Sequence, residues 1–193
     1  MTHSMTHSMK WLVRPCVALV LGALLWPWGP APRDPRALAP RLLGPVASLA
    51  ASVQWVRFDM TVQEGQFESA YAIAERALTL DPRAPQGWMH LASHLAYFRA
   101  SAENEPRPER RRQWIAAALE LLQRGEGQTS EPAELAFMRG LVLYTVAQID
   151  AEQGLGWPGG RSAALSAAIQ AFQNAGDLGH SRGHSLAHIL VGG

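Results

Sequence analysis

Residues 65–95 limit the possible folds more than any other stretch of the chain; they read GQFESAYAIAERALTLDPRAPQGWMHLASHL. Small residues follow one another here at helical spacing and share one helix face, namely Ala70, Ala74 and Ala77. This helix must end at Asp81-Pro82, because proline cannot continue a helix and pushes the preceding residue out of the α region. A second helix with the same spacing then opens with Trp88, Leu91, Ala92 and Leu95. Two helices joined by a tight turn, with alanines where they approach, form the unit of an α-solenoid.

This unit resembles the tetratricopeptide repeat, whose period is about 34 residues. The residues that match the packing positions of that family are Gly65, Ala70, Ala74, Ala77, Pro82, Trp88, Leu91, Ala92 and Leu95. Further along the chain the same small-residue positions recur at Gly140, Ala164, Ala168 and Ala171. The resemblance covers residues 52–176 and implies an all-α fold, a tetratricopeptide-like solenoid of about three repeats. The alternative is an alanine-rich helical hairpin outside this family.

Helical periodicity also marks the segments on either side of this stretch. Residues 46–63 are predicted to form the first helix, since apolar residues recur at intervals of three and four: Leu49, Val53, Val56 and Met60. Residues 113–124 and 132–149 form further helices, and Pro132 suits the first position of the second one. Ser162 is predicted to cap the last strong helix.

Two connections, residues 99–112 and 154–160, are longer than the turns of the repeat family. The first contains Arg110, Arg111 and Arg112 close to Trp114, a combination that can bind phosphate groups. Three glutamates nearby cancel this charge, so a solvated helix start is predicted and nucleic-acid binding is not. The pattern offers no physical reason for either insertion.

The first 45 residues differ from the rest of the chain. Residues 1–28 open with the duplication MTHSMTHSM, so Met9 is an alternative start, and Lys10 and Arg14 then precede the uncharged run from Pro15 to Trp28. This order is typical of a signal anchor, and residues 11–28 are expected to enter a membrane with the N-terminus inside. Cleavage as a secretory signal is the alternative. The five prolines of residues 29–45 indicate an extended spacer, which would hold a helical domain, residues 46–193, on the extracytoplasmic side.

Catalytic and metal-binding patterns are weak in this chain. Cys16 is its only cysteine, which excludes disulfides and cysteine zinc clusters within the chain. His90 and His94 are four residues apart, as zinc ligands often are, but no glutamate follows His90 to complete an HExxH motif. A second series, also spaced by four, consists of His180, His184 and His188. We therefore expect no metal, no cofactor and no enzyme, with a metal-dependent enzyme that uses His90 and His94 as the less favoured alternative.

The resemblance itself points to protein binding. In the tetratricopeptide family the first helix of each repeat lines a concave groove, and the matching positions here are Trp55, Asp59, Met89, Ser93, Tyr97, Phe137, Leu141 and Tyr144. Aromatic and methionine side chains make an adaptable surface for a peptide or a helix. The expected function is a membrane-held scaffold or adaptor. The alternative is a structural subunit of a bacterial envelope assembly, either anchored or secreted.

Overall fold

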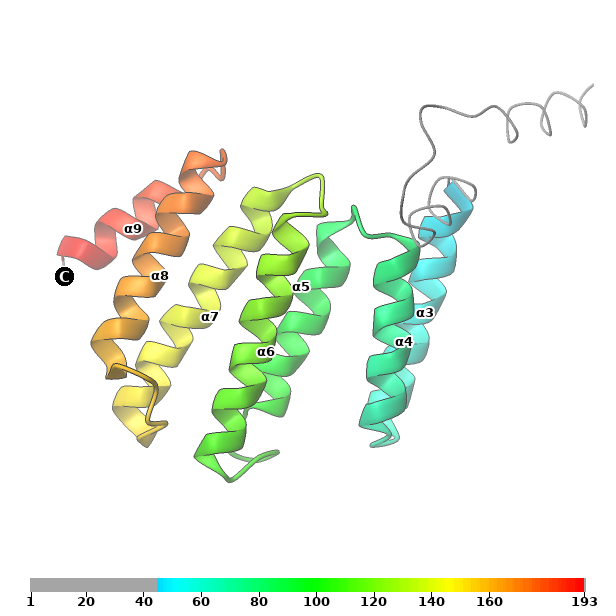
Figure 1. Ribbon diagram of the computed structural model, residues 1–193, viewed down its shortest axis with the longest axis horizontal. Coiled ribbons are helices and arrows are strands. Elements are labelled where there is room, and N and C mark those ends of the chain that lie inside the picture. The colour runs from blue at the N-terminus through cyan, green and yellow to red at the C-terminus, as the bar shows by residue number, and fades with distance from the viewer. Residues whose placement is uncertain (1–44, 193) are drawn as a thin grey trace, which may run out of the picture.

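The computed structural model describes residues 45–192, and this part of the chain is entirely helical, which confirms the predicted all-α class (Figure 1). The helices are α3 (Pro45–Gln63), α4 (Phe67–Leu80), α5 (Pro85–Ser93), α6 (Pro108–Glu126), α7 (Pro132–Gln153), α8 (Gly160–Asp177) and α9 (Gly183–Gly192), and the π-helical turn η2 (His94–Arg99) continues α5. The predicted tail and anchor, residues 1–28, lie outside the described residues, as does the predicted linker up to residue 44. None of the helices within residues 45–192 combines the length and the apolar character that a membrane crossing requires.

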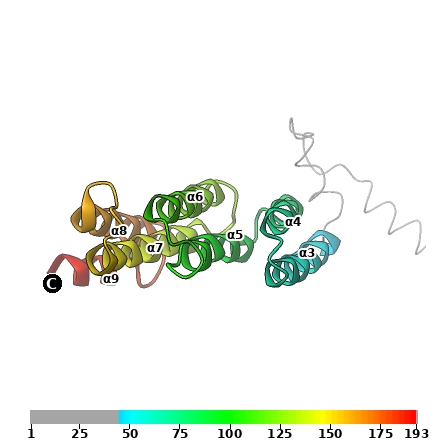
Figure 2. The ribbon, with the colours of Figure 1, turned by 90° about the horizontal axis from the view of Figure 1, so that it is seen from below.

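The helices stand side by side in a row, and consecutive helices run in opposite directions (Figure 1). Seen along the helix axes, α3, α5 and α7 form one layer, and α4, α6 and α8 form the other (Figure 2). Each helix of the first layer is followed along the chain by its partner in the second. Helix α9 lies across the far end of the row and packs on α8.

Small residues allow the paired helices to approach each other closely. The alanines of α4 and α8 that were predicted to pack are all buried: Ala70, Ala74, Ala77, Ala164, Ala168 and Ala171. In α7 a Cβ at Gly140 would lie 2.6 Å from the ring carbons Cδ1 and Cε1 of Phe172, so only glycine fits there. Helix α5 and its continuation η2 also contribute to the core, and the residues expected to pack there are buried: Trp88, Leu91, Ala92 and Leu95.

Most of the predicted helix ends agree with the structure. Helix α4 ends at Leu80 with Asp81 as its C-cap, and Pro132 lies in the first turn of α7. In the turn between α3 and α4, Gly65 has φ +74°, a conformation that side-chain-bearing residues rarely adopt. The prediction for Ser162 is wrong. Helix α8 begins at Gly160, and its N-cap residue Gly159, at φ 77°, provides no capping side chain.

The apolar periodicity of α3 correctly predicts a helix, but not which of its faces is buried. Apolar stripes usually turn inward. In α3 the inward face is instead formed by Ala47, Ala51 and Phe58, while the stripe of Leu49, Val53, Val56 and Met60 is more than half exposed. The helix is thus apolar on two faces, because alanines that pack on α4 alternate with large aliphatic residues that point away from it.

The two long connections lie along the same edge of the row, at the lower ends of the helices in Figure 1. Helix α6 begins at Pro108, so the first connection is shorter than predicted and the arginine run lies inside the helix. Arg111 had been predicted to be solvated with the rest of this run, but it is only 5% exposed. Its Nε donates to the carbonyl oxygen of Ala100 at 2.8 Å, and its Nη2 donates to Oε1 of Gln153 at 2.9 Å. Arg111 therefore binds the end of the α5–η2 segment and the end of α7 together.

Candidate functional site

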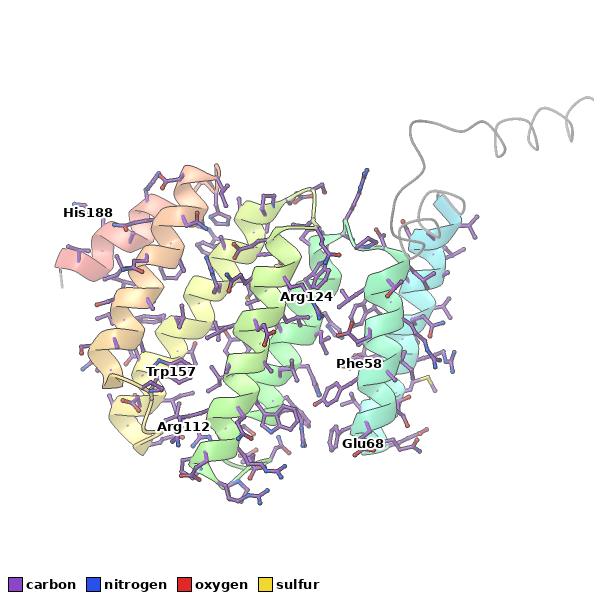
Figure 3. All side chains as sticks on the ribbon, viewed as in Figure 1. Phe58, Glu68, Arg112, Arg124, Trp157 and His188 are labelled. Carbon is purple, nitrogen blue, oxygen red and sulfur yellow. The ribbon has the colours of Figure 1, made fainter. Side chains whose placement is uncertain are left out.

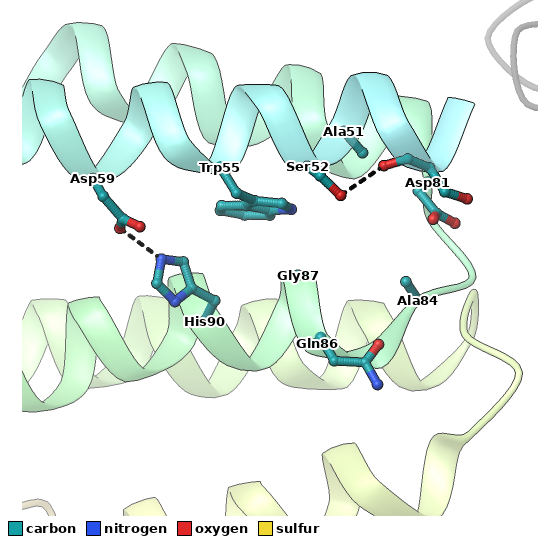
Figure 4. Close-up of a pocket in the computed structure, with 10 residues that line it drawn as sticks. Ala51, Ser52, Trp55, Asp59, Asp81, Ala84, Gln86, Gly87 and His90 are labelled. Atoms are coloured by element: carbon teal, nitrogen blue, oxygen red, sulfur yellow. Dashed lines mark hydrogen bonds and ion pairs between the residues drawn. The ribbon is translucent and has the colours of Figure 1, made fainter. Parts of the chain in front are cut away.

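A cleft of ≈ 360 Å³ lies between α3 and α5, beside the connection that follows α4 (Figure 4). Both helices come from the same layer of the row but from successive helical pairs (Figure 2). The residues that line the cleft are Ser48, Ala51, Ser52, Trp55, Asp59, Asp81, Ala84, Gln86, Gly87 and His90. Two of them, Trp55 and Asp59, are residues that the resemblance placed in a groove.

The floor of the cleft depends on a glycine. A Cβ at Gly87 would lie 2.9 Å from Cζ2 of Trp55 and 3.2 Å from Cδ2 of Leu78. The absence of a side chain at this position lets the Trp55 indole lie flat against α5 between the two helices (Figure 4). Ala51 and Ala84 also line the cleft, and their small side chains leave space beside its floor.

Asp59 and His90 join the two sides of the cleft. Nε2 of His90 lies 2.9 Å from Oδ1 of Asp59, and the two side chains remain 44% and 51% exposed. Asp59 had been expected to line a groove, and His90 had been considered as half of a zinc pair. The structure pairs them with each other instead, because the facing sides of α3 and α5 present both residues at the same height (Figure 4).

The charge of the cleft is predominantly negative. Asp59 and Asp81 contribute carboxylates, and His90 is the only lining residue that can become a cation. Gln86, Ser48 and the Trp55 indole add neutral groups. An indole face and carboxylates at close range are the groups that attract an organic cation.

A cluster of aromatic rings lies behind the cleft, where α3, α4 and α5–η2 meet. Phe58 is edge-on to His90 at 5.4 Å and to His94 at 5.3 Å between ring centroids. His94 also stacks on Phe98 at 5.0 Å, and its buried Nε2 has no hydrogen-bond partner. Burial, together with the nearby Arg99 guanidinium, lowers the pKa of His94 from 6.5 to about 4. His94 is therefore a neutral member of this cluster at physiological pH.

The arrangement does not provide a nucleophile for covalent catalysis. Ser52 donates its hydroxyl proton to the carbonyl oxygen of Ser48 at 2.9 Å. The Trp55 ring separates Ser52 from the Asp59–His90 pair (Figure 4). Between residues 45 and 192, no three or more metal-ligating side chains lie together in a way that could hold an ion.

The other residues that were predicted to line a groove lie further along the row. Met89 is half-buried and packs against the larger core, and Ser93 is also half-buried. Tyr97 is 40% exposed. Phe137 is 7% exposed and stacks on His180 at 3.8 Å, so its ring belongs to the core of the α7–α9 end. Leu141 and Tyr144 are half-buried against that same core.

Sequence reasoning missed part of the cleft. Gln86, Gly87 and the Asp59–His90 contact were not predicted, although the repeat register already placed the first helices of neighbouring units side by side. That register was the signal that could have paired Asp59 with His90, which are 31 residues apart. Asp81 was recognised only as the end of a helix.

Comparison of the chain with protein families, with curated proteins and with solved structures finds no match.

Proposed function

We propose that the helical domain is a tetratricopeptide-like interaction module that binds a segment of another protein in the α3–α5 cleft. The observation that supports this most is the joining of Trp55 and Asp59 with His90 across two successive helical pairs. These residues belong to the first helices of neighbouring units, the position at which the repeat family binds its partners. The module acts as an adaptor and performs no chemistry of its own.

The cleft favours a basic side chain of the bound segment. Its two carboxylates, Asp59 and Asp81, face a volume of ≈ 360 Å³, which is at the small end of ligand sites and suits one long side chain. The Trp55 indole offers a ring face to a lysine ammonium or an arginine guanidinium. Gln86 supplies an amide for the backbone of the segment. The partner therefore presents a lysine or arginine in an exposed stretch of its chain.

Residues 11–28 would hold this module at a membrane. The support is the uncharged run from Pro15 to Trp28, preceded by Lys10 and Arg14. Placing two arginines in the run, as Leu19→Arg with Leu24→Arg, should release the full chain from carbonate-washed membranes. A chain that stays in the membrane fraction after this change would exclude these residues as the anchor.

The binding proposal is tested by photo-cross-linking in membranes that contain the full chain. A photoreactive residue at Gln86, at the rim of the cleft, should capture a partner. The same residue at Gln173, which is exposed on α8 far along the row, serves as the matched control. Trp55→Ala and, separately, Asp59→Asn should each abolish the Gln86 product without loss of helicity.

Mass spectrometry of the captured segment then tests the charge argument. Replacing its lysine or arginine by glutamine should weaken binding of a synthetic peptide by about ten-fold, as expected for loss of a cation beside an indole and carboxylates. A product that persists in both Trp55→Ala and Asp59→Asn would exclude the cleft as the binding site.

A further inference from the structure

The outer face of α3 carries an apolar stripe that nothing in the described chain covers. Five large aliphatic side chains form it, with exposed fractions of 60% for Val46, 67% for Leu49, 52% for Val53, 60% for Val56 and 57% for Met60. Helix α3 is the first of the row, and its neighbours α4 and α5 lie only on its other sides (Figures 1 and 2). A contiguous stripe of this kind, unlike scattered surface leucines, indicates an interaction site.

The spacing of the stripe is that of a coiled-coil seam. Its members follow one another at alternating steps of three and four residues, so Val46, Val53 and Met60 occupy one heptad position and Leu49 and Val56 the other. Repeated steps of three and four are what two helices require to keep facing each other along their length.

We propose that the stripe binds the same stripe of a second copy of this chain, forming a two-helix seam of α3 with α3. Val46 and Val53 at one heptad position and Leu49 at the other follow the pattern that favours two strands, although Met60 and Val56 do not. The stripe runs for about 21 Å from Val46 to Met60, since each helical residue rises 1.5 Å. Two such stripes with their flanking residues bury on the order of 1,000 Å², the lower limit of a specific interface. The same patch on both copies gives a closed, symmetric dimer.

The charges of α3 argue against a lipid surface as the occupant. Helices that lie in a membrane interface carry several lysines or arginines along their polar face. Arg57 is the only basic residue of α3, Asp59 offsets it, and the face opposite the stripe is buried against α4.

Disulfide cross-linking of the full chain in membranes tests this dimer. In a Cys16→Ser background, Val53→Cys places one thiol at the middle of the stripe, where either direction of helix pairing brings the two copies close. We expect a dimer on a non-reducing gel after mild oxidation. Ser166→Cys, at an exposed position of α8, is the control that should stay monomeric. Val46→Cys should cross-link to itself only if the two helices run parallel.

A second variant, without an introduced cysteine, tests whether the two copies associate in the absence of disulfide formation. Val53→Arg, free of cysteine, should halve the mass of the protein part in detergent, measured by light scattering, with helicity unchanged since Val53 is already 52% exposed.

The proposal is overturned if the parent chain is monomeric and Val53→Cys cross-links no more than Ser166→Cys. It is equally overturned if, with Cys16 retained, Val53→Cys forms an internal disulfide in a monomer, because residues 11–28 would then cover the stripe. Quenching of a probe at Val53 by bromo-lipids in a monomer would assign the stripe to the bilayer instead.

Discussion

Arg112 on α6 donates a hydrogen bond from Nη1 to the carbonyl oxygen of Leu155 at 2.7 Å, and this contact ties α6 to the connection between α7 and α8. Leu155 is fully buried. The backbone N–H of Trp157, two residues later, donates to Asp150 on α7 at 2.7 Å. Figure 3 labels Arg112 and Trp157 near the lower ends of α6 and α7. The connection between α7 and α8 thus forms one structural unit with the neighbouring ends of α6 and α7.

Substitution of Arg111 and of Arg110, which precede Arg112 on α6, tests this unit directly. Arg111→Met removes two hydrogen bonds from a buried guanidinium and leaves the Ala100 carbonyl and the Gln153 amide without their donor. We expect the free energy of unfolding to fall by about 3 kcal/mol, the range for bonds made by a charged group. Urea unfolding followed by circular dichroism measures this.

Arg110→Met is the control, because Arg110 is exposed one position earlier on the same helix. Its effect should stay within about 0.5 kcal/mol, as for ordinary surface changes. Equal effects of the two substitutions would mean that the buried hydrogen bonds of Arg111 add no more to the free energy of unfolding than an exposed arginine does.

The aromatic cluster should make stability depend on pH. The pKa of His94 is about 4 in the folded chain against 6.5 for an ordinary histidine, so the unfolded chain binds more protons between these values. The stability contributed by neutral His94 is therefore complete above about pH 6.5 and is lost as the pH falls through 4. The charged groups around it are Arg99 and His90, which oppose its protonation, and Asp59, which favours it.

Replacing this histidine isolates its contribution from that of the other histidines. His94→Phe keeps a ring against Phe58 and Phe98, and it should reduce the loss of thermal stability between pH 7 and pH 4.5. His188→Phe, at an exposed position of α9, should leave that loss unchanged. Melting temperatures measured across this range compare the variants. Parallel pH profiles for His94→Phe and the parent would refute the role of His94.

Close packing of α7 on α8 depends on Gly140. Gly140→Ala should destabilise the domain by about 1–3 kcal/mol, because the new methyl group must displace the Phe172 ring from a well-packed core. Gly127→Ala is the matched control. Gly127 is exposed at φ −79°, which alanine adopts without strain, and its nearest atom is 3.6 Å away. Chemical unfolding that ranked the two substitutions equally would contradict the close approach at Gly140.

Gly87 should control the shape of the cleft. Gly87→Ala places a methyl group against Cζ2 of Trp55 and forces the indole away from α5. We expect cross-linking from Gln86 to the partner to fall while the helical content is retained. Ala84→Gly, which enlarges the wall beside Gly87 on the same side of the cleft, should preserve that cross-link. An unchanged yield in Gly87→Ala would show that the position of Trp55 does not matter for binding.

Local features of the chain were sufficient to predict the helices and their packing faces in α4, α5 and α8. Proline and glycine positions marked most of the ends, because they act on the backbone of their own residue and its neighbours. The capping prediction at Ser162 failed because two glycines with positive φ start α8 two residues earlier. For α3 the periodicity was real, yet large aliphatic residues lay on one face and alanines on the other. The larger apolar side chains favoured burial of the first face. The second face is buried instead, because its small residues pack against the alanines of α4.

The candidate site was predictable only in part for the same reason. Trp55 and Asp59 followed from the repeat register, which is a property of spacing along the chain. Their contacts with Gly87 and His90 depend on how closely α3 approaches α5, and that distance is set by packing of side chains from several helices at once. The two insertions show this most clearly, since nothing in their own residues indicates that Arg112 would meet Leu155. By itself the sequence determined an all-helical chain with alanine-lined pairs. Tertiary structure alone decided which apolar face stays open and which distant polar residues meet, because both outcomes depend on contacts between segments far apart in the chain.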